Sequence, residues 1–332
     1  MRGKKFIGLA LLLAVMLIVA ACGSVSDSGN SDKKEGSNSS DKGVTIQHDG
    51  GTTKITKEPK RVVALEYSFV DSLVALGVKP VGIADDGDKN NIIEPIRKNL
   101  GDYKSVGARK QPNLEVISEL KPDLIIADNN RHKGTYDQLN KIAPTLLLPS
   151  LDSDYNENIE AFKTIAKALS KEDQADKRLK EHQEKIDSYK KDITMNKDLK
   201  VLPAVISQSG FLAHADKSYV GQFLHELGFK EALTKEVSDQ LPEYLNAPYL
   251  NMNSEQLAEV NPERMFIMVN GEDDPFYAKM KEDSVWNNID AVKNNRVHVV
   301  DRLTWAKSRG LISSEEIAKE LAEISKEESN KN

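Results

Sequence analysis

The sequence SKEDQADKRLKEHQEKIDSYKKDITMNKD, residues 170–198, predicts one long helix in the middle of the chain, and the two halves on either side of it define the architecture. It contains neither Gly nor Pro, and larger side chains recur in it three or four residues apart, at Leu179, His182, Ile186, Tyr189 and Ile193. That spacing predicts one face of a helix, and a helix of about 24 residues would span about 36 Å. Ser170 and Asp173 predict its start as a capping box in which Asp replaces the usual Glu or Gln. We interpret the helix as a rigid strut between two lobes; a peripheral helix of one lobe is the alternative.

Short apolar runs alternate with helical patterns on both sides of this stretch. Before it, the predicted strands are 61–65, 80–83, 123–127 and 145–148, and the predicted helices are 68–76, 92–100, 113–120 and 134–142. After it, the alternating segments are 201–207, 218–227, 253–259, 264–268, 284–291 and 296–300, with a closing helix at 313–325. Strands that alternate with helices predict parallel sheets covered on both faces. The predicted class is therefore α/β, with two similar lobes, residues 44–169 and 199–332, joined by one long helix, residues 170–198.

Residues 1–21 have the character of a secretory signal peptide. Arg2, Lys4 and Lys5 precede an uncharged, mostly apolar run from Phe6 to Ala21, which is the usual order of such a peptide. A permanent transmembrane helix needs about 20 apolar residues. Cleavage is therefore favoured over a membrane span.

Cys22 is the only cysteine of the chain, so no intrachain disulfide can form. Val19-Ala20-Ala21-Cys22 resembles the lipobox of bacterial lipoproteins, in which the cysteine receives a lipid and becomes the new N-terminus. The alternative is an incidental thiol beside a conventional cleavage site, but a leftover cysteine in an exported protein needs an explanation. Residues 22–43 are mostly small and polar, which predicts a flexible tether behind the anchor.

The charge balance excludes some classes of partner. Removal of residues 1–21 takes away three of the 46 Lys and Arg, which leaves nine more Asp and Glu, of 52, than Lys and Arg. An acidic surface argues against nucleic acid and against electrostatic binding to membranes. About 280 folded residues fit two domains of ordinary size.

Two motifs carry a family resemblance. Pro112-Asn113-Leu114-Glu115-Val116-Ile117 followed by Lys121-Pro122-Asp123-Leu124-Ile125-Ile126-Ala127 resembles the periplasmic siderophore- and cobalamin-binding proteins, and Leu257-Ala258-Glu259-Val260-Asn261-Pro262-Glu263 extends the likeness to the second lobe. Four further segments resemble ferric dicitrate-binding proteins: residues 82–86, 105–109, 127–132 and 304–310. The resemblance implies two α/β lobes bridged by one long helix, with the ligand in a cleft between them and little movement on binding. It also implies delivery of the ligand to the permease and ATPase of an ABC importer.

Ferric citrate is an anion whose iron is already coordinated, so a protein that captures it has to satisfy carboxylate oxygens and needs no metal ligands or cofactor of its own. Guanidinium groups suit this because they are always charged and hold carboxylates bidentately. Sites in open α/β sheets lie at loops after strands, and three arginines occupy such loops: Arg109, Arg131 and Arg309. We expect them to form a cationic clamp with two members from the first lobe and one from the second.

Other residues near these loops are weaker candidates. Lys307 is a possible ligand contact, and Trp305 and Tyr67 could wall the ligand, although aromatic residues beside strands are more often core. Asp85, Asp86 and Asp88 form an acidic loop that we interpret as turn chemistry, in which a carboxylate could orient a neighbouring arginine.

Permease docking in this family uses an exposed Glu on each lobe. The resemblance implies Glu115 for the first lobe; for the second, Glu226 is the nearest match, with a register uncertain by one residue. We expect a monomer on the extracytoplasmic face of the cell membrane.

Three other functions are weighed against this one. A catecholate or hydroxamate ferric siderophore is the strongest alternative ligand, because catecholates are also anionic. A binder of bare metal ions is disfavoured because the six histidines form no closely spaced pair of the kind that zinc sites use. An extracytoplasmic enzyme is disfavoured because no nucleophile or metalloprotease motif is present.

Overall fold

The computed structural model describes residues 43–234, 237, 247–271 and 273–331. The predicted signal peptide, Cys22 and nearly all of the predicted tether lie outside these residues. Within the part described, no helix combines the length and the apolar character that a membrane span requires.

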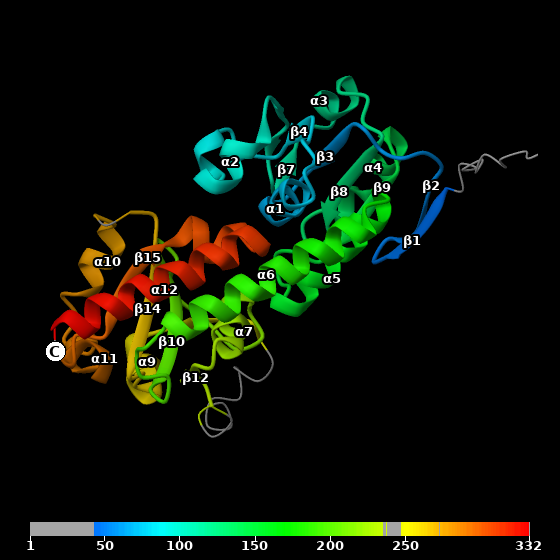
Figure 1. Ribbon diagram of the computed structural model, residues 1–332. Coiled ribbons are helices and arrows are strands. Elements are labelled where there is room, and N and C mark those ends of the chain that lie inside the picture. Colours follow the sequence, from blue (N-terminus) through cyan, green and yellow to red (C-terminus); the bar gives the residue numbers. More distant parts are fainter. Residues whose placement is uncertain (1–42, 235–236, 238–246, 272, 332) are drawn as a thin grey trace, which may run out of the picture. The chain divides into compact units, whose positions relative to one another are not determined.

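A five-stranded parallel sheet forms the first lobe (Figure 1). Its strands, in spatial order, are β5 (Lys104–Ser105), β4 (Gly82–Ile83), β3 (Val62–Ala64), β8 (Leu124–Asp128) and β9 (Thr145–Leu148). The helices are α1 (Tyr67–Ala75), α2 (Glu94–Leu100), α3 (Leu114–Glu119), α4 (Tyr136–Ile142) and α5 (Tyr155–Ala168). Strands β3, β8 and β9 are buried along their whole length, as expected for a sheet with both faces covered.

Two antiparallel ribbons complete this lobe. They are β1 (Val44–His48) with β2 (Gly51–Ile55), and β6 (Gly107–Ala108) with β7 (Gln111–Pro112). The second ribbon carries Arg109 in its turn.

The second lobe has a mixed sheet. Its strands run in the order β13 (Tyr249–Met252), β11 (Gly210–His214), β10 (Lys200–Ser207), β14 (Arg264–Val269) and β15 (Val297–Asp301), with β12 (Lys230–Glu231) beside β10. Strands β10, β14 and β15 are parallel, whereas β11 and β13 are antiparallel to their neighbours. The surrounding helices are α7 (Tyr219–Glu226), α9 (Ser254–Val260), α10 (Pro275–Met280) and α11 (Asp290–Lys293).

The lobes repeat one local design. In each, an Asn caps a short helix, a residue with positive φ ends it (Lys121, +45°; Asn261, +40°), and an X-Pro-acid triplet leads into a buried parallel strand. The acid then accepts backbone N–H groups at the start of the adjacent strand: Asp123 from Lys60 and Arg61, and Glu263 from Lys200. This repetition confirms the prediction of two similar α/β lobes.

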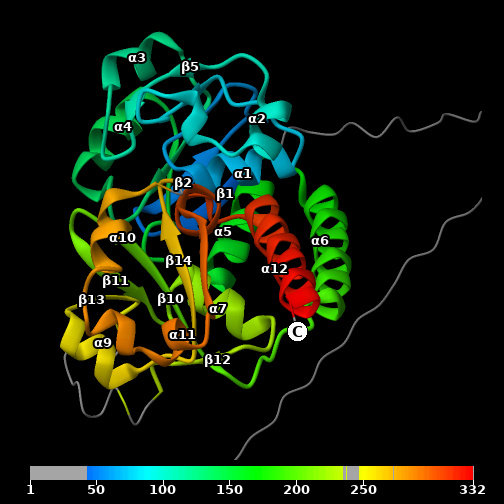
Figure 2. The same ribbon diagram turned by 90° about the vertical axis from the view of Figure 1, so that its left-hand side faces the viewer.

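The predicted strut is the helix α6 (Glu172–Asp192), of 21 residues. It begins later than predicted, because Ser170 adopts a positive φ of 54° and Lys171 is the N-cap without a side-chain hydrogen bond. The predicted capping box is therefore wrong. The last helix, α12 (Leu311–Lys331), packs along α6 (Figures 1 and 2) and also contacts α1 of the first lobe. Two packed helices, α6 and α12, therefore connect the lobes, rather than one.

Candidate ligand-binding site

A cavity of about 270 Å³ is lined by residues from both lobes. Five of its lining side chains are cationic: Arg109, Arg131, Arg302, Lys307 and Arg309. The remaining ones are Leu151, Asp152, Val205, Leu212, His214, Tyr249 and Ala306. The cavity thus brings together the three predicted arginines and Lys307.

Arg109 is held by the acidic loop after β4. Its backbone N–H donates to Oδ1 of Asp86 (2.8 Å), and its Nε and Nη2 donate to Oδ2 of the same carboxylate (2.9 and 2.8 Å). Partial burial raises the pKa of Asp86, but the hydrogen bonds and charge of Arg109 outweigh it and hold that pKa below its ordinary value. A carboxylate of the acidic loop does orient a neighbouring arginine.

Tyr67 lies directly beneath this arginine. The Arg109 guanidinium carbon is 3.9 Å from the centre of the Tyr67 ring, a cation–π contact, and the Tyr67 hydroxyl donates to Asp86 (3.1 Å). Tyr67 is almost fully buried and does not line the cavity. Its ring supports the guanidinium from the protein side.

Arg131 sits in a loop that Asp128, at the end of β8, organises. The Asp128 carboxylate accepts the backbone N–H groups of Asn130 (3.1 Å), Arg131 (2.7 Å) and Leu151 (2.9 Å). His132 joins this loop to the Arg109 turn: its Nδ1 accepts the Asp128 backbone N–H, so its Nε2 carries hydrogen and donates to the carbonyl of Arg109 (2.7 Å). Burial lowers the pKa of His132, in keeping with this neutral tautomer.

Arg309 follows a π-helical turn, η5 (Leu303–Ser308), after β15. It has a left-handed backbone, φ 48°, which is strained for a residue with a Cβ. Its Nη1 donates to the carbonyl of Ala306 (2.9 Å), and its Nη2 reaches Ser150 of the first lobe (3.4 Å). The second lobe therefore projects this guanidinium onto the first.

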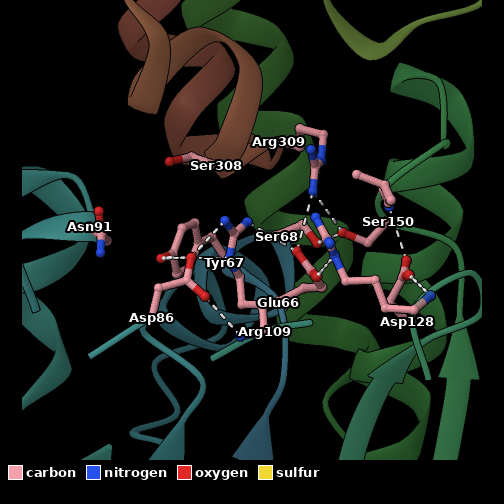
Figure 3. Close-up of polar contacts among 12 residues, drawn as sticks. Glu66, Tyr67, Ser68, Asp86, Asn91, Arg109, Asp128, Ser150, Ser308 and Arg309 are labelled. Atoms are coloured by element: carbon pink, nitrogen blue, oxygen red, sulfur yellow. Dashed lines mark hydrogen bonds and ion pairs between the residues drawn. The ribbon is translucent and has the colours of Figure 1, made fainter. Parts of the chain in front are cut away.

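The three arginines converge on one carboxylate that sequence reasoning did not find. Glu66, fully buried at the junction of β3 and α1, has Oε1 at 2.5 Å from Nε of Arg131, an ion pair not aligned as a hydrogen bond. Its Oε2 is 3.4 Å from Nη1 of Arg109 and 3.3 Å from Nη2 of Arg309. Figure 3 shows Arg109 and Arg309 directed at Glu66 from different sides.

Arg302 and Lys307 differ from the other cations because, among the described residues, neither side chain makes a hydrogen bond or ion pair. Burial lowers the pKa of Lys307, and the positive charges of Arg302 and Arg109 lower it further. Burial lowers the pKa of Arg302 as well. Both groups would gain from a neighbouring anion.

His214 and Tyr249 form the uncharged wall of the cavity. Their rings meet edge to face at 4.8 Å, and the Tyr249 hydroxyl donates to the carbonyl of Leu151 in the first lobe (2.8 Å). Burial, then the charges of Arg309 and Arg302, lower the pKa of His214 to about 3. His214 is therefore neutral at physiological pH and can offer a ring N–H without adding charge.

The other predicted residues lie elsewhere. Trp305 is fully buried in the core of the second lobe, where its ring packs against Phe266 and its Nε1–H donates to Glu320 (2.6 Å). It has no surface on the cavity, in line with the core alternative. Arg302, His214 and Tyr249 were missed in the sequence, although Arg302 directly follows β15, where a strand-end search could have found it.

Glu115 and Glu226 are both exposed. Glu115 is in the first turn of α3, whose Asn113 cap accepts its N–H (3.1 Å). Glu226 ends α7, and its carbonyl accepts a hydrogen bond from Lys190 of α6 (2.8 Å). In the repeated design, the counterpart of Glu115 is instead Glu255, exposed in the first turn of the Asn253-capped helix α9.

Comparisons with known proteins agree with this architecture. Residues 62–302 match the family model described as periplasmic binding protein. The Fe(3+)-citrate-binding protein YfmC of Bacillus subtilis (strain 168) is 41% identical over 313 residues, 94% of each chain. The Fe(3+) dicitrate-binding periplasmic protein FecB of Escherichia coli (strain K12) is 34% identical over 281 residues, 85% of this chain and 90% of FecB. Staphylococcus aureus SirA, crystallised with staphyloferrin B, aligns with a TM-score of 0.72 at 33% identity, over 84% of this chain and 97% of SirA.

Proposed function

Because the chain belongs to the periplasmic binding protein family, we propose that it captures ferric citrate outside the cytoplasm and delivers it to the permease and ATPase of an ABC importer. The ligand is bound and released unchanged, so no catalytic step is involved. The observation that carries the proposal is the cavity with five cationic side chains contributed by both lobes.

The chemistry of the cavity fits a polyanionic chelate. Arg109, Arg131 and Arg309 present charged N–H donors suited to carboxylate oxygens. Arg302 and Lys307, whose side chains make no hydrogen bond or ion pair among the described residues, supply positive charge that an anion would neutralise. The neutral His214 and Tyr249 offer hydrogen-bonding edges without repelling the ligand.

The test is calorimetric titration of the purified protein with ferric citrate, free citrate, and ferric catecholates and hydroxamates. We expect ferric citrate to bind in preference to the others. Alanine at Arg109, Arg131 or Arg309 should weaken binding by about 2–3 kcal/mol, the contribution of hydrogen bonds to charged groups in a desolvated site. The matched control is Lys110→Ala, which removes an exposed cation beside Arg109 and should leave affinity unchanged.

If all three arginine variants bind like the parent, the clamp is refuted. Preferential binding of a ferric catecholate or hydroxamate would instead identify the ligand as another siderophore. Both outcomes are separable from misfolding by the thermal unfolding midpoint of each variant.

We also propose that the mature protein is anchored to the membrane through lipid on Cys22. The basis is the signal-peptide pattern of residues 1–21 and the resemblance of Val19-Ala20-Ala21-Cys22 to a lipobox. One acyl chain alone binds a protein to a membrane only weakly, and stable anchoring usually requires a second chain or another membrane-binding signal. A diacylglycerol group carries two acyl chains and therefore suffices. Cys22→Ser should therefore move the protein from the membrane fraction to the soluble extracytoplasmic fraction, and retention of that variant in the membrane fraction would contradict the anchor.

Docking to the permease completes the proposal. We assign Glu115 to this role in the first lobe, with the protein acting as a monomer. For the second lobe, Glu226 remains the prediction from the sequence and Glu255 is the candidate that the repeated helix design favours. Charge reversal at these positions distinguishes them.

A further inference from the structure

Glu66 occupies the N-cap position of a helix, but its side chain does not cap that helix. It is the N-cap of α1, but its carboxylate makes no capping hydrogen bond to the helix. Side chains of Asp and Asn at this position usually satisfy the free N–H groups of the first turn. The Glu66 carboxylate instead extends from the end of β3 to the three guanidinium groups (Figure 3).

Its partners come from three separate segments and two lobes. Arg109 lies in the β6–β7 turn, Arg131 in the loop after β8, and Arg309 after the π-helical turn of the second lobe. Each of the two carboxylate oxygens is engaged, Oε1 by Arg131 and Oε2 by the other two. Glu66 is the shared partner that relates the three arginines to one another.

The charge of Glu66 works against an anionic ligand. A buried carboxylate close to the cavity floor repels citrate, and taking it out of water is costly unless it is paired. A favourable contribution of Glu66 to ligand binding must therefore come from its effect on the three arginines. Three guanidinium groups held this close repel one another, and a shared carboxylate between them offsets that repulsion and fixes their side-chain conformations.

We propose that Glu66 is a positioning residue that holds Arg109, Arg131 and Arg309 in the arrangement that binds the ferric chelate, without touching the chelate itself. The inference rests on the proposed function. Glu66 has no exposed surface, so it acts through the arginines. Asp86 assists at Arg109 alone, whereas Glu66 couples all three.

Whether Glu66→Gln strengthens or weakens binding of ferric citrate distinguishes a positioning role of Glu66 from a purely electrostatic effect of its charge. Glu66→Gln removes a negative charge beneath the cavity, so electrostatics alone predicts tighter binding of an anion. Positioning predicts weaker binding, by at least tenfold in Kd, with most of the loss in the dissociation rate. Glu119→Gln is the matched control because it removes one negative charge from an exposed side chain of the same lobe that does not line the cavity. That variant should bind ferric citrate as tightly as the parent or more tightly.

A second variant shows whether weaker binding comes from lost positioning or from failure of the first variant to fold. Glu66→Asp keeps the charge but withdraws the carboxylate by one methylene, and it too should weaken binding. In a background carrying Arg309→Ala, the further loss on Glu66→Gln should be clearly smaller than in the parent, because part of what Glu66 positions has gone. A residue with a purely structural role would lower the unfolding midpoint and leave this coupling near zero.

The outcomes are distinct. Equal or tighter binding by both Glu66 variants overturns the positioning role while leaving the proposed function intact. If the parent binds none of the chelates, the proposed function fails, and crystal structures of the parent and Glu66→Asp decide the inference. Displaced guanidinium groups in the variant support it, and unchanged ones overturn it.

Discussion

Gly310 shows how closely one residue can be constrained by its surroundings. It follows Arg309 and lies against Asp71 of α1, whose carboxylate accepts the backbone N–H groups of Ile312 (3.1 Å) and Ser313 (2.9 Å) at the start of α12. The carbonyl of Gly310 accepts the Tyr219 hydroxyl (2.8 Å). A Cβ added at Gly310 would be 2.2 Å from Cγ of Asp71. Asp71 is fully buried, so its carboxylate could move away from an added methyl group only by displacing packed neighbours and its own hydrogen bonds.

Gly310→Ala is therefore expected to lower the free energy of unfolding by about 2–3 kcal/mol, as overpacking of a filled interior does. It should also weaken ferric citrate binding, because the adjacent Arg309 would shift. Urea unfolding and calorimetric titration measure the two effects. Gly134→Ala is the control: no atom lies within 4 Å of a Cβ built there, so the change should be below about 1 kcal/mol. Equal stabilities for the two variants would contradict the packing argument.

The arginines could be predicted from the sequence, whereas their shared partner could not. Each arginine lies in a loop just after a strand or beside a Gly, and the chemistry of a carboxylate ligand selects it. Glu66, in Leu65-Glu66-Tyr67, reads as an ordinary acidic residue at the start of a helix. Its role depends on the meeting of three segments that are up to 243 residues apart in sequence, which no local pattern encodes.

Helices α6 and α12 are joined by a cluster of polar side chains around the buried Glu315 of α12. Its Oε1 pairs with Arg178 (2.7 Å) and His182 (2.9 Å), and its Oε2 with Lys185 (2.9 Å), all on α6. Nε2 of His182 accepts the Tyr155 hydroxyl of α5 (2.6 Å), so Nδ1 carries hydrogen and donates to Glu315. The strut predicted from apolar spacing thus owes part of its attachment to polar side chains.

Glu315→Gln should destabilise the protein in a pH-dependent way. Burial alone would raise the pKa of Glu315, but His182, Arg178 and Lys185 together lower it to about 2. A folded-state pKa below the unfolded value contributes stability that is present above pH 4.5 and is lost as the pH falls through about 2. At pH 7 this contribution is on the order of 3 kcal/mol.

Denaturant unfolding of the parent and Glu315→Gln at pH 7, 4.5 and 3 checks this. The difference between the two proteins should be largest at pH 7 and fall to about half at pH 3. Glu323→Gln, an exposed acid on the same helix, should change stability by less than about 0.5 kcal/mol. A pH-independent difference would mean that the loss comes from packing rather than from ionisation.

Helices and strands with a strong hydrophobic pattern could be predicted from the sequence. Strands that depend on pairing with neighbouring strands could not. The buried strands β8, β9 and β14 fall within one residue of their predicted positions, whereas α6 begins two residues after the predicted start at 170 and ends six residues before the predicted end at 198. Helix α5 was missed, although Asp154 and Glu157 form a true capping box at its start. The antiparallel strands β11 and β13 were missed because their pattern follows from pairing across the sheet.

Contacts across the cleft tie the two lobes together. The Glu66–Arg309 ion pair, the Asp71 cap on α12 and the Tyr249–Leu151 hydrogen bond each join residues of different lobes. With α6 and α12 packed along each other, large hinge motion would break all of these at once. The arrangement accords with the limited movement expected for the family, so under the proposed function we expect the permease to recognise the surface of the lobes rather than a large change of domain angle.

The repeated helix design of the two lobes predicts which exposed acids would form the docking surface for the permease. Residues 113–119 and 253–259 have the same sequence of exposed and buried positions, with an Asn cap and an exposed Glu two residues later. Glu115 and Glu255 therefore occupy equivalent places on the two lobes, whereas Glu226 ends a different helix. If docking uses equivalent acids on the two lobes, Glu255 is the second one.

Charge reversal tests this at the level of transport. Glu115→Lys and Glu255→Lys should each reduce uptake of radioactive iron supplied as citrate by at least tenfold, in cells whose only citrate-binding protein is the variant, while the Kd of the purified protein stays at the parent value. Each exchanges an attraction to a transporter cation for a repulsion, and like-charge juxtaposition at an interface costs several kcal/mol. Glu226→Lys serves as the matched exposed control and should retain uptake. If it abolishes uptake and Glu255→Lys does not, the sequence-based assignment of Glu226 is right and the repeat does not extend to docking.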